Sequence, residues 1–339
     1  MRSPGRAERS DRLIDSHGRT IRDLRLSITD RCNFRCTYCM DPDVRFAPPA
    51  ELLSVKEMLR VVGVCRDMGV KKVRLTGGEP TLHPELERII AGVAGLGVSD
   101  LALTTNGSLL TPEAAARWRD AGLGRVTVSL DTLKPEKMRE ITRSSTPPAR
   151  VLEAVEACLG AGLGPVKINA VVVRGFNEEE IEDLAELARI YGADMRFIEF
   201  MPLDSARAWE SSRLVTAEEI VSRVRARWEM TPLDRAERSE TSFNYAFSDG
   251  APGRVGVIAS VTRPFCGACS RLRITADGMV RPCLFSRDEW DLRTLLRSGA
   301  DDAHLKAFLA DATWGKQAGH GISEPGFRQP DRPMSAIGG

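Results

Sequence analysis

Residues 23–40 read DLRLSITDRCNFRCTYCM and combine a strand-like run with a cysteine motif. The run at 24–29 predicts a strand, and the loop behind it carries Cys32, Cys36 and Cys39 in a C-x3-C-x2-C pattern. Three thiolates suit a [4Fe–4S] cluster with one free iron, because each thiolate binds one of the four irons. The free iron is then a binding site for another molecule.

Strands and helices alternate along the following chain. Further strand-like runs lie at 73–76, 101–105, 125–130, 166–173 and 194–200, and helical stretches follow the six runs near 54–68, 84–95, from 111, at 135–142 with 149–161, 177–190 and 216–228. Six such units predict a parallel sheet with right-handed crossovers. Because a closed TIM barrel has eight, we expect an incomplete (β/α)6 TIM-type barrel, with a doubly wound sheet as the alternative.

Chemically distinctive residues occur where these strands end. Gly77–Pro80 follow the second strand, Thr105 and Asn106 close the third, Ser129 and Asp131 close the fourth, and Met201 follows the sixth. In β/α barrels the carboxyl ends of the strands and the loops behind them build the active site. We therefore expect these segments to meet at one mouth.

A second cysteine group lies near the C-terminus. Cys266, Cys269 and Cys283 form C-x2-C-x13-C, a spacing that by itself suits zinc and an iron–sulfur cluster equally. Cys65 and Cys158 lie in apolar helical patterns and are expected to be core thiols. A disulfide framework is typical of short secreted chains, and this sequence has neither property.

Composition limits the range of functions. The 339 residues include 48 Lys+Arg and 47 Asp+Glu, a net charge of +1, which argues against a general nucleic-acid coat. Acidic residues interrupt the N-terminal arginines, and no apolar run follows them as in a signal peptide. No run approaches the length of about 18 apolar residues needed to span a membrane. We expect a cytoplasmic protein without nucleic-acid or membrane partners.

The expected organisation has three parts. Residues 1–20 form a polar N-terminal segment, residues 21–232 the partial barrel, and residues 233–339 an α/β extension with the second cysteine group. Cations on the predicted strands point to an anionic ligand, because a strand interior is a poor place for an unpaired arginine. These are Arg25, Arg74, Lys167 and Arg196, together with Arg271 and Arg273, which are two apart and share one strand face.

The first cysteine motif, with Tyr38 inside it, and GGEP at 77–80 resemble the radical S-adenosylmethionine (SAM) enzymes. From Arg22 to Gly339 the sequence is similar to the GTP 3′,8-cyclase family, which performs the first step of molybdenum cofactor biosynthesis. RLTGGEPTL, LTTNG, VKINAVV, RFIEFMPL, the second cysteine group, GHGI and the Gly338-Gly339 end carry this resemblance. Segment 234–250 matches the family weakly, and no role is assigned to His320.

The resemblance implies specific residue roles. Two [4Fe–4S] clusters would be held by the two cysteine groups, with guanine of GTP on the open iron of the second. SAM contacts are implied for Tyr38, Gly78, Ser129 and Met201, with Tyr38 and Met201 near the adenine. GTP contacts are implied for Arg25, Arg74, Thr105, Lys167, Arg271, Leu272 and Arg273. Catalytic roles are implied for Arg271 and Arg273, in substrate positioning or charge stabilisation, and for Gly338 and Gly339, which would thread into the barrel mouth.

The resemblance also implies a reaction and partners. A 5′-deoxyadenosyl radical from SAM would abstract the C3′ hydrogen of GTP, and C3′ would then attack C8 of guanine. Reduction and protonation give (8S)-3′,8-cyclo-7,8-dihydroguanosine 5′-triphosphate. The expected partners are a second copy of the chain, an electron donor of unknown identity, and the next enzyme of the pathway, which receives the product.

Two other functions stay open at the level of sequence. One is a different radical SAM enzyme with an auxiliary cluster, such as a peptide-modifying maturase. Arg271, Arg273 and the Gly-Gly end argue against it. The other is a non-enzymatic iron–sulfur or zinc regulatory protein, which the six strand–helix units and the GGEP segment disfavour.

Overall fold

A computed structural model describes residues 11–204, 207 and 209–338. Within that part of the chain, one sheet has the order β12-β11-β10-β1-β2-β3-β4-β5-β6-β9-β8-β7. The strands are β1 (Asp23–Ser27), β2 (Lys72–Thr76), β3 (Asp100–Thr105), β4 (Arg125–Ser129), β5 (Lys167–Val172), β6 (Asp194–Glu199), β7 (Met230–Pro232), β8 (Phe243–Phe247), β9 (Arg254–Ile258), β10 (Arg271–Ile274), β11 (Met279–Arg281) and β12 (Trp290–Asp291). Strands β1 to β6 are neighbours in sequence order and pair in parallel.

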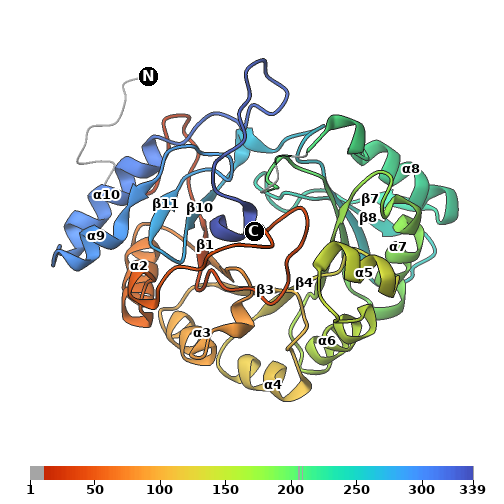
Figure 1. Ribbon diagram of the computed structural model, residues 1–339, viewed down its shortest axis with the longest axis horizontal. Helices are drawn as coiled ribbons and strands as arrows, with labels where there is room; N and C mark the ends of the chain where they lie inside the picture. Colours follow the sequence, from red (N-terminus) through yellow and green to blue (C-terminus); the bar gives the residue numbers. More distant parts are fainter. Residues whose placement is uncertain (1–10, 205–206, 208, 339) are drawn as a thin grey trace.

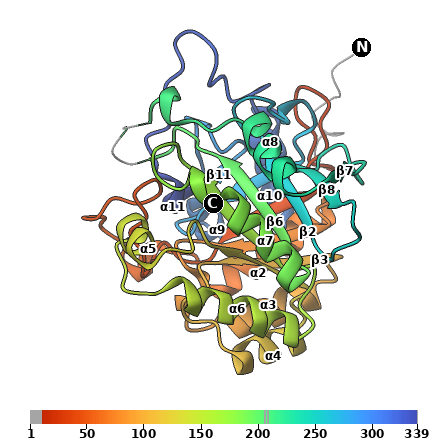
Figure 2. The same ribbon diagram turned by 90° about the vertical axis from the view of Figure 1, so that its right-hand side faces the viewer.

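Helices surround the curved sheet on its outer side, and the C-terminal end lies at its centre (Figure 1). They are α2 (Val55–Asp67), α3 (Leu86–Gly95), α4 (Pro112–Asp120), α5 (Pro135–Thr142), α6 (Pro148–Gly160), α7 (Ile181–Tyr191), α8 (Ala217–Arg227), α9 (Leu292–Arg297), α10 (Asp302–Trp314) and α11 (Met334–Ile337). Short 3-10 helices are η1 (Pro49–Glu51), η2 (Pro80–Leu82), η3 (Glu178–Glu180), η4 (Ser211–Arg213) and η5 (Cys266–Ala268). Figure 2 shows α3, α4 and α6 together along one edge of the molecule.

Local sequence explains where these helices begin. Ser54 caps α2 and forms a capping box with Glu57, so both residues satisfy backbone N–H groups that lack helical partners. Thr111 caps α4, and Pro112 occupies the first turn, where its missing N–H costs nothing. Each helix turns apolar residues toward the sheet. One continuous core results, with Leu26, Leu75 and other strand residues buried at its centre.

The incomplete barrel is confirmed. The doubly wound alternative is wrong, because such a sheet reverses its strand order and β1 to β6 do not. Most predicted boundaries lie within two residues of the observed ones. The stretch expected as a helix from 177 starts instead as η3 and becomes α7 at Ile181.

The C-terminal region extends both edges of the barrel sheet. Strand β9 pairs in parallel with β6, while β10 pairs in parallel with β1. Sequence patterns left this pairing open, because it depends on contacts between distant segments. The second cysteine group is thereby brought beside the first strand. No helix among the described residues is long and apolar enough to cross a membrane.

Candidate active site

The first cysteine trio lines a cavity at the carboxyl ends of the strands. Cys32, Cys36 and Cys39 share this cavity with all four expected SAM contacts, Tyr38, Gly78, Ser129 and Met201. Burial is the main cause that raises the pKa of Cys32 to about 11 and of Cys39 to about 12, and it also raises the pKa of Cys36 well above its usual value. Binding iron as thiolates would release these protons.

Two glycines bring the loop after β2 against the cysteine loop. A Cβ at Gly78 would lie 2.3 Å from the carbonyl oxygen of Arg31, and one at Gly77 would lie 2.4 Å from that of Thr29. Both positions therefore exclude a side chain because of the protein's own backbone. The next residue, Glu79, is 1% exposed and accepts hydrogen bonds from Thr105 Oγ1 at 2.7 Å and from the N–H of Asn106 at 2.7 Å.

Asp131 connects the cysteine loop to the ends of β4 and β5. Its Oδ2 accepts from the Tyr38 hydroxyl at 2.7 Å, and its Oδ1 accepts from the N–H of Val171 at 2.8 Å. Burial is the largest influence on this carboxyl and raises its pKa to about 6. The network thus fixes the position of Tyr38 within the cysteine motif.

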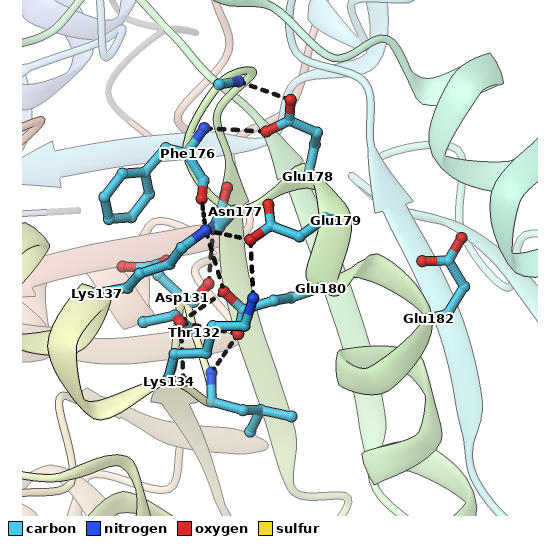
Figure 3. Close-up of polar contacts among 12 residues, drawn as sticks. Asp131, Thr132, Lys134, Lys137, Phe176, Asn177, Glu178, Glu179, Glu180 and Glu182 are labelled. Atoms are coloured by element: carbon cyan, nitrogen blue, oxygen red, sulfur yellow. Dashed lines mark hydrogen bonds and ion pairs between the residues drawn. The ribbon is translucent and has the colours of Figure 1, made fainter.

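Polar contacts from the segment after β5 support the backbone around Asp131 (Figure 3). Asn177 donates to the carbonyl oxygens of Asp131 at 2.7 Å and Val171 at 2.9 Å. Glu180 is 1% exposed and accepts from Thr132 Oγ1 at 2.8 Å. Buried polar groups with all their partners hold a single arrangement, so this end of the cavity is rigid.

The second trio lines a neighbouring cavity. Cys266, Cys269 and Cys283 face it together with Arg271 and Arg273. Burial opposes ionisation of Cys269, but the charges of Arg271 and Lys316 outweigh it and lower the pKa of this thiol to about 6. The two cations therefore favour the thiolate form of Cys269.

A third cavity, of about 260 Å³, is lined mainly by cations. These are Arg25, Lys72, Arg74, Arg125, Lys167, Arg196 and Arg271, against the carboxylates Asp23, Glu237 and Glu240. It lies toward the amino-terminal ends of the strands, opposite to the mouth expected from sequence. The cavity reaches into the interior of the barrel, because its cations occupy positions of their strands that face inward.

Arginines lie side by side across three neighbouring strands of this region. Arg25 on β1 is in register with Arg74 on β2 and with Arg273 on β10. Burial, followed by repulsion from nearby arginines, lowers the pKa of Arg25 to about 10 and holds those of Arg74 and Arg273 well below their usual value. Nε of Arg196 is buried and has no hydrogen-bond partner among the described residues. Like charges on neighbouring strands repel one another, so an anion bound between them would stabilise this arrangement.

The three cavities adjoin through shared lining residues. Asn169 and Met201 line both cysteine cavities, and Arg25 and Arg271 line both the second cysteine cavity and the cationic one. The second cysteine cavity therefore borders both the first one and the cationic cavity. The expected GTP contacts Arg25, Arg74, Lys167, Arg271 and Arg273 all line the second cysteine cavity or the cationic one.

Two expected GTP contacts lie elsewhere. Thr105 lines the first cavity, where its hydroxyl donates to Glu79. Leu272 is 0% exposed and belongs to the core, because alternate residues of β10 face opposite sides of the sheet. Leu272 itself lines none of the three cavities.

The C-terminal tail enters the barrel. The carbonyl oxygen of Gly338 accepts a hydrogen bond from Nη1 of Arg273. A Cβ on Gly338 would lie 2.2 Å from Ser27 Oγ and 2.7 Å from Thr76 Oγ1, at the ends of β1 and β2. Gly339, the other expected catalytic glycine, lies outside the described residues.

Several lining residues were absent from the sequence-based prediction. Lys72 and Arg125 line the cationic cavity, and their signal was their place at the start of predicted strands. His320 lines the second cavity, where one ring nitrogen lies 2.8 Å from the carbonyl oxygen of Ser260 and the other accepts from the N–H of Ile322. Both ring nitrogens are thus used structurally. The loop at 236–241 covers the cations, and Glu237 pairs with Lys72 at 2.9 Å.

The donor sets fit iron–sulfur clusters. Among residues 11–338, leaving out 205, 206 and 208, no three His, Cys, Asp or Glu side chains gather closely enough to hold a single metal ion. A four-iron cluster binds its thiolates at separate corners, so a trio spread along a cavity wall is compatible with it. All eight cysteines are free thiols, and Cys65 and Cys158 are buried as expected.

Comparisons with known proteins define the class. The model of the radical SAM superfamily matches residues 26–188, and that of the Molybdenum Cofactor Synthesis C family matches residues 193–322. The fold is also similar to that of SuiB from Streptococcus suis, solved with S-adenosylmethionine, at a TM-score of 0.61 and 16% identity over 84% of this chain and 67% of that one. Barrel, first trio and family models together define a radical SAM enzyme, a class that uses SAM and an iron–sulfur cluster.

Curated relatives narrow the class to one family. The GTP 3′,8-cyclase of Streptomyces coelicolor is 47% identical over 330 residues, which are 96% of each chain. That of Mycolicibacterium smegmatis is 45% identical over 334 residues, 96% of this chain and 92% of the relative. The chain belongs to the GTP 3′,8-cyclase family.

Proposed function

We propose that this chain converts GTP to (8S)-3′,8-cyclo-7,8-dihydroguanosine 5′-triphosphate, the first step of molybdenum cofactor biosynthesis. The observation that carries the proposal is the set of three adjoining cavities. The reaction needs a radical source, a site for guanine and a site for triphosphate, in that order along one path. The two cysteine trios and the cations supply them in that order.

The first trio holds a [4Fe–4S] cluster, and Tyr38, Gly78, Ser129 and Met201 hold SAM beside it. When bound, the reduced cluster supplies the electron that cleaves SAM to a 5′-deoxyadenosyl radical. The chain itself contributes an ordered site. Asp131 fixes Tyr38 through the 2.7 Å hydrogen bond, and the buried polar network behind it supports this arrangement.

The second trio holds a second [4Fe–4S] cluster, whose open iron binds a base nitrogen of guanine. Cys266, Cys269 and Cys283 offer three thiols in a polarised cavity, and a three-thiol set leaves one of four irons open. A single zinc ion fits this trio less well, because among the described residues no three such side chains gather closely enough to hold one metal ion.

The cationic cavity holds the triphosphate. A triphosphate carries about four negative charges, which guanidinium and ammonium groups neutralise through charge-assisted hydrogen bonds. Arg25, Arg74, Lys167 and Arg271 are the proposed contacts, and the unpartnered Nε of Arg196 adds a fifth donor. Thr105 and the backbone of Leu272 complete the proposed GTP contacts.

Arg273 and the Gly-Gly end place the substrate for ring closure. Arg273 contacts Gly338, so the tail and the cation act together beside the second cavity. Arg271 lines the second and third cavities and is placed to hold both ends of the nucleotide. We assign these groups to substrate positioning and to charge stabilisation in the later steps.

The proposal includes the wider setting. The enzyme acts in the cytoplasm as a homodimer, takes electrons from a separate donor, and passes its product to the next enzyme of the pathway. In this assignment residues 21–232 form the catalytic barrel, and residues 233–339 close it with the second trio and the tail.

Product analysis tests the proposal. Protein reconstituted with iron and sulfide under anaerobic conditions is incubated with GTP, SAM and dithionite. The expected product has the mass of GTP, because ring closure followed by addition of one electron and one proton restores the hydrogen removed from C3′. The triple variant Cys266→Ala, Cys269→Ala, Cys283→Ala should lose this product and retain about four of eight irons per chain. Unchanged turnover in the variant, or no product from the wild type, would reject the assignment.

A further inference from the structure

The N-terminal segment that precedes β1 is an ordered hairpin. Residues 13–21 are joined by the antiparallel bridge between Ile14 and Thr20. Leu13 and Ile21 are 0% exposed and anchor the hairpin in the core. The N-terminal segment is polar in sequence, so the anchoring of this hairpin in the core is unexpected.

A buried ion pair lies within this hairpin. Asp15 is 1% exposed and Arg19 is 8% exposed. Asp15 Oδ2 accepts from Nε of Arg19 at 2.6 Å, while Oδ1 accepts from the N–H of Arg19 at 3.0 Å and of His17 at 2.9 Å. The carboxylate therefore fixes both the backbone and the side chain of Arg19. A buried pair costs desolvation energy and is retained only where its remaining donors have partners.

The remaining donors of Arg19 reach the second cysteine trio. Nη1 donates to the carbonyl oxygens of Cys266 and Ala318, both at 2.8 Å, and Nη2 donates to that of Gln317 at 2.6 Å. One guanidinium thus joins a cysteine of the trio to a loop about fifty residues later in the chain. Arg19 does not line the cavity itself, so it acts from behind the wall.

The loop that Arg19 holds packs directly on the trio. A Cβ added to Gly319 would lie 3.7 Å from the Cβ of Cys266. The next residue, His320, lines the second cavity. Lys316, immediately before the held segment, donates from Nζ to the carbonyl oxygen of Arg271 at 2.8 Å and to that of Pro282, beside Cys283.

We propose that Arg19, oriented by Asp15, is a positioning residue for the second iron–sulfur cluster. It holds the Cys266 backbone against the loop at 317–320 and so presents the trio in a cluster-binding arrangement. The inference rests on the second cluster of the proposed function. A lysine cannot replace the arginine, because its single ammonium group cannot span three carbonyl oxygens and a carboxylate in the planar geometry that guanidinium provides.

The test compares cluster content in Arg19→Gln, Arg19→Lys and Asp15→Asn with that of the wild type. Arg60→Gln is the matched control, because Arg60 also pairs with an aspartate, Asp302 at 2.9 Å, and donates to a carbonyl oxygen, that of Ala300 at 2.6 Å. Iron per chain, Mössbauer spectra and the rate of iron removal by a chelator are measured after anaerobic reconstitution. The SAM-induced change in the EPR spectrum of the first cluster serves as the internal reference.

We expect Arg19→Gln to fall from about eight to about four irons per chain with the SAM-responsive cluster intact. Arg19→Lys and Asp15→Asn should lose the second cluster to the chelator about tenfold faster than the wild type, as is typical when support of a metal ligand is removed. Arg60→Gln should match the wild type.

Retention of both clusters at wild-type chelation rates in the Arg19 and Asp15 variants would overturn the proposal, and so would equal loss of both clusters. If Arg19→Gln does not fold, the chelation rates of the other two variants decide the matter. A wild-type protein with only about four irons would instead refute the second cluster of the proposed function, which is a distinguishable result.

Discussion

At the start of β5, the ammonium group of Lys167 lies 3.8 Å from the carboxylate of Asp194 and faces several arginines. Burial, followed by the charges of Arg196 and Arg125, lowers its pKa to about 7. At pH 8 the free enzyme therefore holds this lysine mainly neutral. A triphosphate beside it raises the pKa, so GTP binding takes up a proton, and the affinity for GTP falls as pH rises above 7.

Calorimetry at pH 8 in two buffers of different ionisation enthalpy measures this proton uptake. We expect a buffer-dependent heat of GTP binding in the wild type and none from this site in Lys167→Met. Lys134→Met is the control, because Lys134 pairs with Glu179 at 3.0 Å and lines none of the three cavities. Equal heats in both buffers for the wild type would contradict the role of Lys167.

Gly338 is a second residue whose substitution should affect cyclisation. Its φ of +81° and its contact with Ser27 leave no room for a side chain. We expect Gly338→Ala to displace the tail and lower cyclisation about 100-fold, as misplacement of groups around a substrate does. Iron content should stay at the wild-type value. Gly299→Ala is the control, since Gly299 has φ +82° but no atom near its added Cβ. Full cyclisation by Gly338→Ala would refute the role of the tail.

Sequence predicts residues well where chemistry demands a spacing. The spacing of Cys32, Cys36 and Cys39 predicts a loop that presents three thiols together, and these three do line one cavity. The role of Tyr38 and a cluster at the second trio are implied by the resemblance and not by spacing. The role of Arg19 could not be predicted, because its partners near the second trio are the backbone carbonyl oxygens of residues 266, 317 and 318, and every residue type carries such an oxygen. The resemblance implies a GTP contact for Leu272, but strand alternation turns this side chain into the core.

At the scale of elements, Glu199 at the end of β6 joins two later segments. This carboxylate is 0% exposed and accepts from the N–H groups of Ala217 at 2.8 Å, Val261 at 2.7 Å and Thr262 at 2.9 Å. It therefore fixes the start of α8 and the loop that leads to the second trio. These hydrogen bonds join residues far apart in the chain, so the sequence around Glu199 (FIEF, 197–200) does not predict them.

Glu199→Gln should lower the free energy of unfolding by ~2–3 kcal/mol, because a neutral amide accepts these bonds more weakly and adds an unpartnered donor. Urea denaturation followed by circular dichroism measures the change. Glu136→Gln, at an exposed position on α5, is the control and should be neutral. A Glu199→Gln variant as stable as the wild type would show that the carboxylate does not stabilise this junction.

The six strand–helix units could be read from periodicity because each buries one apolar face locally. The pairing of the strands outside these six units could not be predicted in this way. Strands β9 and β10 pair with β6 and β1 across long stretches of chain, and their short apolar runs carry no information about their neighbours. The loop at 236–241 likewise gains its place over the cations only in the folded sheet.

At the scale of the whole molecule, the barrel sheet places the two cysteine cavities and the cationic cavity next to one another. Charged side chains occupy the interior that a closed barrel fills with apolar residues, and the C-terminal strands and tail border it. The near-zero net charge of the chain conceals this concentration of cations. In the proposed function, a nucleotide with its triphosphate among these cations would have its base beside the second trio and its ribose toward the first.

That placement makes one claim testable above the others: the radical formed at the first site removes hydrogen from the ribose of GTP. GTP deuterated at C3′ is incubated with the reconstituted enzyme, SAM and dithionite without oxygen, and 5′-deoxyadenosine is analysed by mass spectrometry. We expect one deuterium in the 5′-deoxyadenosine formed per product. Unlabelled 5′-deoxyadenosine at full turnover would contradict the account.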